Sequence, residues 1–424
     1  MRSPPSSLLI AAALCSRVAT AGGPASSSAA AAFRASLGAP TPCGARSSMQ
    51  VLHVDPSWLT PDALFDAARG RLHVVFGTAS KDAFYVFSDG GGAFSAPVKL
   101  NTAGLGVTTT MGERGPKLTW GANGRLIAVW ADLWTGPGCR VYARSVFSTD
   151  GGASWSAPTS IAPGLFGIDG LSVAAGTYVT QQVVATFHVN TSEATNASSA
   201  TWLHYSLSND GGVSWRAPQV LHLDGGATPA VACSMCMTRP RFDADTGELL
   251  VAYRSAIADV RSFRVARAAG AEKNDFRTAV VNPRDAWNIS YCPMNGPELT
   301  LAILPQSADV TQLVAYMTGD ANNAFFSSLA AGADSFSAPT PTPLREANER
   351  YPTAVASLSG DVLFVWNVGP MAVSGDATVK WSCYAPGNST ASQSGTLGRS
   401  FAGTKATAID LGDHGGLLLL TSAA

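Results

Sequence analysis

Hydrophobic residues in this chain fall in short runs separated by polar turns, and one two-run unit recurs along most of its length. Each copy has a short apolar segment, a turn, and a second, strongly β-prone run of about five residues that ends in an aromatic side chain. Near-continuous apolar runs of this kind are typical of strands buried on both faces. The unit occurs over residues 61–76, 116–130, 171–187, 240–253, 297–316 and 352–366.

A second motif lies between these units and predicts a tight turn. Residues 148–155 read Ser-Thr-Asp-Gly-Gly-Ala-Ser-Trp, residues 208–215 read Ser-Asn-Asp-Gly-Gly-Val-Ser-Trp, and a weaker copy ends at Phe94. An aspartate carboxylate can accept bonds from the amides of its own turn, and glycine supplies the positive φ that a tight turn needs. The aromatic side chain then packs back over the corner.

The aromatic residues of this motif keep a constant spacing. They stand at positions 94, 155, 215, 276 and 336, so successive copies lie 60 or 61 residues apart. Such a period predicts a closed array of repeated sheets, a β-propeller, over residues 48–424. We favour six blades. Residues 405–421 contain a further apolar pair, which is either a partial seventh blade closed by the N-terminal strand near residues 51–54 or a cover for one edge of a six-bladed ring.

The pattern Ser-x-Asp-x-Gly-x-x-Trp at 148–155 and 208–215 is that of the Asp-box, or BNR repeat, and the chain resembles the sialidase (neuraminidase) superfamily of β-propellers. The resemblance covers about residues 50–424 and implies an all-β propeller of sialidase type. For an active member it also implies three arginines that hold a substrate carboxylate, a tyrosine nucleophile paired with a glutamate, and an aspartate acid/base. Because Asp-boxes also occur in propellers that hydrolyse nothing, the motif indicates the fold more strongly than the reaction.

Candidate site residues lie at the rim opposite the Asp turns, where antiparallel geometry places the starts of the inner strands around the channel mouth. By the resemblance, Tyr351 is the nucleophile and Glu349 its partner. The acid is Asp62 or Asp132, and the substrate clamp is drawn from Arg114, Arg239 and Arg254, with Arg350 in reserve. Where the family has its first clamp arginine this chain has Thr60-Pro61-Asp62, and Arg114-Gly115-Pro116 comes one blade later.

These features lead us to expect an exported glycoside hydrolase that cleaves a terminal acidic sugar from a glycan or glycoconjugate with retention, using no cofactor and no metal. The alternative is a noncatalytic propeller that binds a glycan or a protein through the same rim. A third class, an assembly factor inside an organelle, applies if the leader is a plastid transit signal. The net charge of −1 argues against nucleic acid and anionic membranes as partners.

The N-terminal segment has the features of a secretory leader. A basic start, an apolar run over residues 8–15 and the small-residue pattern Ala19-Thr20-Ala21 predict a signal peptide over residues 1–21, with no integral membrane segment after its removal. Residues 22–47 are a low-complexity leader or linker without acidic residues, so a plastid leader is the alternative. Glycosylation sequons at Asn190, Asn196, Asn288 and Asn388 agree with secretion.

Removal of this leader would also remove Cys15 and leave an even number of cysteines, Cys43, Cys139, Cys233, Cys236, Cys292 and Cys383. Four of these six, Cys139, Cys233, Cys236 and Cys292, fall in the predicted rim loops. In an oxidising compartment we favour disulfides that tie these loops together. Zinc binding by four thiolates, a redox-active Cys-x-x-Cys pair and free thiols remain alternatives.

Overall fold

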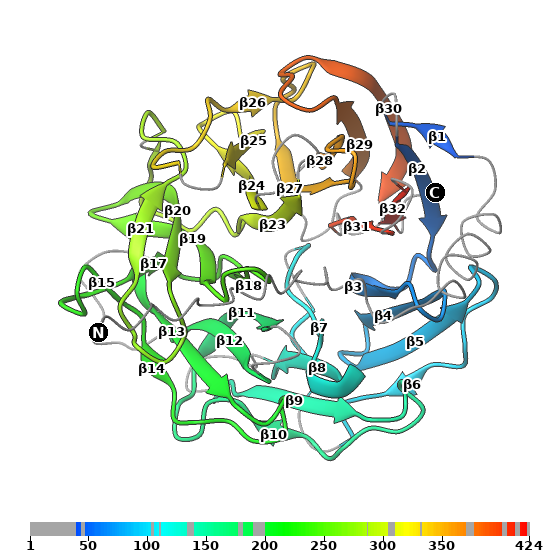
Figure 1. The fold of residues 1–424 in the computed structure, drawn as a ribbon, viewed down its shortest axis with the longest axis vertical. Coiled ribbons are helices and arrows are strands. Elements are labelled where there is room, and N and C mark those ends of the chain that lie inside the picture. The colour runs from blue at the N-terminus through cyan, green and yellow to red at the C-terminus, as the bar shows by residue number, and fades with distance from the viewer. Residues whose placement is uncertain are drawn as a thin grey trace, which may run out of the picture.

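The described residues form a ring of β-sheets around a central axis (Figure 1). The computed structural model describes residues 40–43, 47–102, 106–109, 112–133, 140–176, 181–189, 200–285, 287–303, 310–330, 333–369, 377–400, 405–411 and 416–421. Apart from one short 3-10 helix, η1 (Ala122–Gly124), every regular element in these ranges is a β-strand. The prediction of an all-β propeller is therefore confirmed. In the same ranges no helix is long and apolar enough to cross a membrane.

Six four-stranded units follow one another along the chain, and the predicted two-run units are their two inner strands. The strands of the first three units are β3 (Leu59–Asp66), β4 (Arg71–Gly77), β5 (Ala83–Asp89) and β6 (Val98–Lys99); β7 (Lys117–Trp120), β8 (Leu126–Ala131), β9 (Ala143–Ser148) and β10 (Thr159–Ser160); and β11 (Ile168–Ala175), β12 (Val183–Val189), β13 (Ala200–Ser208) and β14 (Gln219–Val220). Those of the next three are β18 (Arg239–Phe242), β19 (Leu249–Ile257), β20 (Val260–Ala268) and β21 (Arg277–Val280); β23 (Glu298–Ile303), β24 (Val310–Thr318), β25 (Asn323–Leu329) and β26 (Thr340–Pro341); and β27 (Glu349–Ala356), β28 (Val362–Val368), β29 (Ala377–Tyr384) and β30 (Ala391–Ser400).

Short strands connect the third and fourth units. β17 (Val231–Cys233) pairs with both β13 and β19, so the two units share one continuous sheet. β15 (His222–Leu223) and β16 (Thr228–Pro229) form a small hairpin, and β22 (Trp287–Asn288) pairs with β20.

The two ends of the described chain form a seventh four-stranded unit, which corrects the preference for six blades. β31 (Thr407–Asp410) and β32 (Gly416–Thr421) pair antiparallel, and β32 pairs in parallel with β2 (Ser48–His53), whose outer neighbour is β1 (Thr41–Pro42). β31 packs between β27 and β3 and so closes the ring. The unit includes Thr41, ahead of the predicted domain boundary at residue 48.

Leucine side chains of β32 join the seventh unit to its neighbours. Leu417 and Leu419 pack with Val365 and Val379 of the sixth unit, whereas Leu418 packs with Leu72 of the first. Because alternate residues of a strand face opposite sides, a single strand seals both joints.

Replacing Leu419 with alanine is therefore expected to destabilise the protein by about 2–5 kcal/mol, the usual cost of a cavity at a fully buried leucine. Chemical denaturation followed by tryptophan fluorescence would measure the change. The matched control is Leu344→Ala, because the Leu344 side chain is 70% exposed and its truncation should cost no more than about 0.5 kcal/mol. Equal stability of the two variants would show that closure of the ring does not depend on β32.

The two complete Asp turns have the hydrogen bonds that their sequence predicts. In the first, Ser148 Oγ, Ser154 N and Ser154 Oγ donate to Asp150, while Gly152 N donates to Ser148 Oγ. Asp210 accepts the equivalent bonds in the second turn. The aromatic residue that ends each turn reaches the preceding unit: Trp155 packs on Tyr85, and Trp215 Nε1 donates to Ser145 Oγ.

The cysteines differ from the expected pattern. Cys43 and Cys383 form a disulfide, whereas Cys233, Cys236 and Cys292 are free thiols, so the predicted disulfides between these rim loops are not formed in the structure. Two sequon residues, Asn288 and Asn388, are exposed. The predicted leader, Cys139 and the sequons at Asn190 and Asn196 lie outside the described residues.

Candidate functional site at the mouth of the channel

The innermost strands surround the channel, and their starts share a sequence feature that places charged side chains in it. In five units a proline comes immediately before the residue that lines the channel cavity. Proline donates no backbone hydrogen bond and so suits the beginning of a strand. The residues that follow these prolines are Asp62, Lys117, Arg241, Glu298 and Thr353.

Three of the inner strands also carry a β-bulge at their start. The register shifts lie between Leu59 and Asp62 in β3, between Asp169 and Ser172 in β11, and between Arg350 and Thr353 in β27. Inside each bulge one residue has a positive φ, and these residues are Thr60, Gly170 and Tyr351. A bulge re-aims the side chains beside it, as often happens near binding sites.

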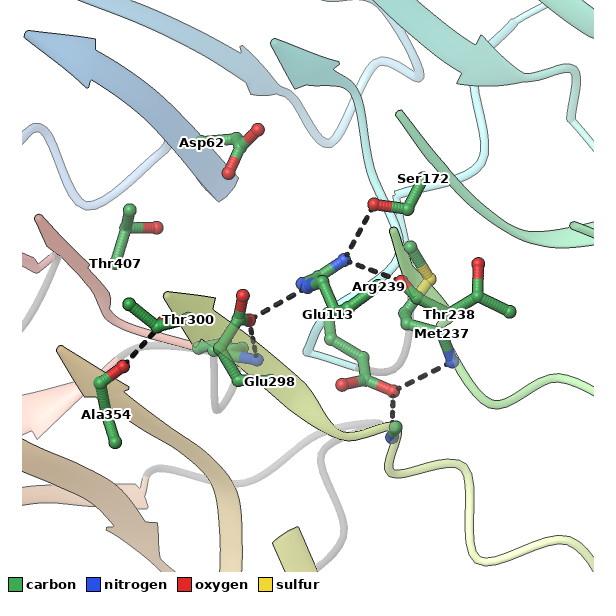
Figure 2. Close-up of polar contacts among 12 residues, drawn as sticks. Asp62, Glu113, Ser172, Met237, Thr238, Arg239, Glu298, Thr300, Ala354 and Thr407 are labelled. Carbon is green, nitrogen blue, oxygen red and sulfur yellow. Dashed lines mark hydrogen bonds and ion pairs between the residues drawn. The ribbon is translucent and has the colours of Figure 1, made fainter. Parts of the chain in front are cut away.

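The channel is lined by charged side chains of both signs. A cavity of about 510 Å³ and a smaller one of about 80 Å³ share Asp62, Lys117, Arg239, Arg241 and Glu298 in their walls, and Lys405 lines the smaller one. Glu298 accepts hydrogen bonds from Arg239 Nε at 2.8 Å, Lys405 Nζ at 2.7 Å and Arg241 Nη2 at 3.4 Å. Figure 2 shows this carboxylate beside Arg239, with Asp62 across the channel.

Burial and neighbouring charges shift two pKa values in the channel in the same direction for different reasons. Burial alone would raise the pKa of Glu298, but Arg239, Lys405 and Arg241 outweigh it and hold the pKa well below the usual 4.5. Burial lowers the pKa of Lys117 to about 8, although the nearby Asp62 opposes the change. Lys117 therefore titrates close to neutral pH.

Glu113 lies between the channel and the mouth, and only one of its oxygens is occupied. Oε1 accepts hydrogen bonds from Gly296 N at 2.7 Å and from Met237 N at 3.4 Å (Figure 2). Oε2 is buried and has no partner among the described residues. Burial raises the pKa of Glu113, while Lys405 and Arg239 oppose the shift. The free oxygen can therefore accept a proton.

Further polar groups at the mouth are buried without complete hydrogen bonding. Arg114 forms an ion pair with Asp169. His188 Nε2 lies 2.6 Å from the carbonyl oxygen of Cys236, and since a carbonyl can only accept, Nε2 is the donor. The other ring nitrogen, Nδ1, is buried with no partner among the described residues. The side-chain amide of Asn295 also has none. Such groups are rare in proteins and point to bound water or a ligand.

Tyr351 is the central residue of this group. Its side chain is only 2% exposed, and its hydroxyl has no hydrogen-bond partner in the described part of the chain. Burial and the nearby Glu113 carboxylate raise the pKa of Tyr351, whereas Arg350 and Arg114 lower it. The phenol is therefore neutral and lies in the field of one carboxylate and two guanidinium groups.

In the structure Glu349, the expected partner of Tyr351, forms no hydrogen bond with its hydroxyl. Glu349 accepts hydrogen bonds from Ala324 N, Thr342 Oγ1 and Glu346 N, and so holds the β25–β27 connection together. Residues two apart in a regular strand share a face, but the bulge after Arg350 breaks that relation. Glu113, from another unit, is the carboxylate that acts on Tyr351.

Of the other predicted site residues, some lie in the channel or at its mouth and others lie elsewhere. Arg114 and Arg350 lie near Tyr351, and Arg239 and Asp62 line the channel below. Arg254 is a structural residue, because its guanidinium donates to the carbonyls of Asn295 and Met317 and packs on Phe263. Asp132 is paired with Arg144 at 3.1 Å and lines neither cavity. The arginine triad expected from the resemblance does not converge as predicted.

Sequence reasoning did not assign Lys117, Glu298 and Lys405 to the site. For Lys117 and Glu298 a usable signal exists, since each follows a proline that opens an inner strand, as Asp62 does. Lys405 has no such signal and reaches the channel through the closing unit, where it binds Glu298.

Replacing Glu298 with glutamine is expected to destabilise the protein by about 3–5 kcal/mol near neutral pH, since Arg239 and Lys405 would lose their buried counter-charge. Because the folded-state pKa of Glu298 is below 4.5, its contribution is present above pH 4.5 and is lost as the pH falls through the lowered pKa. The difference in unfolding free energy between wild type and variant should therefore shrink in acid. Glu272→Gln, at an exposed ion pair with Arg216, is the control and should cost at most about 1 kcal/mol.

Comparison with known proteins supports the fold and leaves the chemistry open. No family model matches the sequence, and no curated protein matches it. Among solved structures, the BP39L lectin from Burkholderia pseudomallei is similar with a TM-score of 0.57 and 12% identity, over 87% of this chain and 97% of the lectin. An α-L-arabinanase from Penicillium chrysogenum, complexed with arabinobiose, has a TM-score of 0.50 and 13% identity, over 78% and 94% of the two chains. A PL25 polysaccharide lyase, an ulvan lyase, has a TM-score of 0.50 and 10% identity, over 87% and 89%. At such identities the likeness shows a β-propeller fold alone.

Proposed function

We propose that this propeller is a glycan-active enzyme, a retaining hydrolase of a terminal acidic sugar of the exo-α-sialidase type, with Tyr351 as nucleophile and Glu113 as its base. The observation that carries the proposal is the buried hydroxyl of Tyr351, which has no hydrogen-bond partner among the described residues and lies in the field of Glu113, Arg350 and Arg114. A buried polar group without a partner costs free energy. A substrate at the mouth would supply that partner.

The chemistry follows from the free atoms of the site. Tyr351 Oη forms a bond to the anomeric carbon as the bond to the leaving oxygen breaks, and the phenolic proton moves to Glu113 Oε2. The leaving oxygen takes a proton from Asp62, which lines the same cavity as Glu113. Water then attacks the anomeric carbon and gives its proton to Asp62 as the bond to Tyr351 Oη breaks, and Glu113 returns the phenolic proton to that oxygen. A neutral phenol suits an acidic sugar, since an anionic nucleophile would be repelled by the substrate carboxylate.

Guanidinium groups at the mouth support an acidic substrate. Arg114 and Arg350 flank Tyr351, and Arg239 lies beneath them beside Glu113. Arginine presents donors in a fixed fork that matches a carboxylate. An exported protein is also part of the proposal: the Cys43–Cys383 disulfide suits an oxidising compartment, and the sequon residues Asn288 and Asn388 are exposed.

The second candidate function is glycan binding without turnover. It is favoured by the burial of the reactive groups, since Glu113 is 1% exposed and Tyr351 is 2% exposed. A sugar could then be held at the rim without reaching the phenol.

Three measurements on one preparation separate these functions. Release of fluorophore from a 4-methylumbelliferyl sialoside, glucuronide or galacturonide, with the neutral galactoside as control, reports hydrolysis; NMR of the first product reports its anomeric configuration. Binding of the same sugars is measured by calorimetry. Turnover of an acidic substrate with retention supports the proposal. Binding without turnover supports the second function, and inversion or a neutral-sugar preference rules out the tyrosine mechanism.

A further inference from the structure

Three buried thiols from two rim loops meet beside the mouth. Cys233 ends β17, Cys236 follows in the next turn, and Cys292 comes from the connection between β22 and β23. The sulfur of Cys292 lies 3.2 Å from that of Cys233 and 3.6 Å from that of Cys236. We propose that Cys233, Cys236 and Cys292 bind one zinc ion.

The sulfur positions fit a metal better than a disulfide. A disulfide bond is about 2.05 Å long, well below the shortest of these distances. Zinc–sulfur bonds of about 2.3 Å in a tetrahedron place the sulfurs about 3.8 Å apart. All three sulfurs lie within 4.8 Å of one another, so changes of about 1 Å or less in these separations bring them to three corners of that tetrahedron. The fourth corner is left for water or another ligand.

The surroundings of the sulfurs are those of a thiolate site. Zinc with three thiolates carries one net negative charge, and the buried guanidinium groups of Arg254 and Arg261 act on Cys233. The backbone N–H of Met294 donates to the sulfur of Cys292 at 3.4 Å. Binding releases the thiol protons to solvent and transfers no electrons.

The apolar residues around the thiols and the sequence spacing of two of them also support a zinc site. Val231, Met235, Met294 and Ala256 enclose the sulfurs. Cys233 and Cys236 have the Cys-x-x-Cys spacing that is common in zinc sites.

The ion would fix the loops that hold the candidate catalytic groups. The carbonyl of Cys236 accepts a hydrogen bond from His188 Nε2. The backbone amides of Met237 and Gly296, one from each loop, both donate to Glu113. The loops touch so closely that a β-carbon on Gly296 would lie 2.3 Å from the carbonyl oxygen of Met237. Zinc would therefore position Glu113 without touching substrate. Only this consequence rests on the proposed function.

The test is the zinc content of the full-length protein, purified without chelators and measured by elemental mass spectrometry. We expect about one zinc per chain in the wild type and in the controls Ser234→Ala and Met294→Leu, and near-complete loss in Cys233→Ser and Cys292→Ser. Cobalt substitution should give the intense thiolate-to-metal absorption that serine variants lack. Chelation should lower the melting temperature, and added zinc should restore it.

Three results would overturn the proposal: wild-type protein with no zinc and three reactive thiols, an intact-mass loss that reveals a second disulfide, or full zinc content in Cys292→Ser. None of these readouts depends on turnover. If zinc is present while every glycoside is left intact, the metal site stands and the proposed function fails.

Discussion

Replacing Tyr351 with phenylalanine is expected to reduce turnover of the acidic substrate by about 10⁴-fold or more, the scale seen when a covalent nucleophile is removed. The substitution keeps the ring, and the hydroxyl that it removes has no partner among the described residues. Folding stability should therefore stay the same or rise, since a buried polar group without a partner is costly. Initial rates and denaturation midpoints, measured on the same samples, check both expectations.

Tyr384→Phe is the matched control for this variant. Tyr384, in the sixth unit, is also buried, but its hydroxyl donates to the carbonyl of Pro341 in the fifth unit at 3.1 Å. Its loss should cost about 1 kcal/mol of stability and no activity. A Tyr351→Phe variant that keeps its activity would remove Tyr351 from the mechanism, whatever its stability.

Glutamine substitutions distinguish Glu113 from Glu349 as the partner of the phenol. Glu113→Gln should lower turnover by about 10²–10⁴-fold, because the base is lost while Oε1 can still accept from Gly296 and Met237. Glu349→Gln should leave turnover unchanged and lower stability. Since the base must be ionised and burial raises the pKa of Glu113, the acidic limb of kcat/KM should lie above pH 4.5 and vanish in Glu113→Gln.

Local chemistry explains why much of the fold could be predicted from the sequence. The Asp turn is stabilised within a few residues, as the bonds of Ser148 and Ser154 to Asp150 show, so its sequence pattern marks the units that carry it. The number of units could not be predicted in the same way. The seventh depends on the parallel pairing of Ser48–His53 with Gly416–Thr421, and neither the Asp pattern nor its period extends to these strands.

The candidate site was predictable only as far as regular strand geometry holds. Tyr351 lies at the mouth as expected, because the start of an inner strand must reach that rim. The expectation that Glu349 is its partner relied on two-residue alternation, which ends at the bulge between Arg350 and Thr353, where Tyr351 has a positive φ. The role of Glu113 depends on amides from the fourth and fifth units, a contact that no local pattern encodes.

The disulfide between Cys43 and Cys383 should make the largest single contribution to stability. It links residues 340 apart and connects the edge of the seventh unit to β29 of the sixth. In the chain-entropy account, closing so long a loop restricts the unfolded chain by about 6 kcal/mol, and measured losses for native disulfides are about 2–5 kcal/mol. The double variant Cys43→Ala, Cys383→Ala should therefore unfold at clearly lower denaturant concentration than the oxidised wild type.

Reduction of the wild type provides the control for the cavity that alanine leaves at these two buried positions. If the bridge itself stabilises the closed ring, a mild reductant should lower the unfolding midpoint of the wild type almost as far as the double substitution does, and it should have little further effect on the variant. Limited proteolysis should then cut first near β1 and β2, whose parallel pairing with β32 is the joint that the disulfide protects. Equal midpoints for oxidised and reduced wild type would show that packing of β32 against both neighbours is enough to hold the ring closed without the covalent bond.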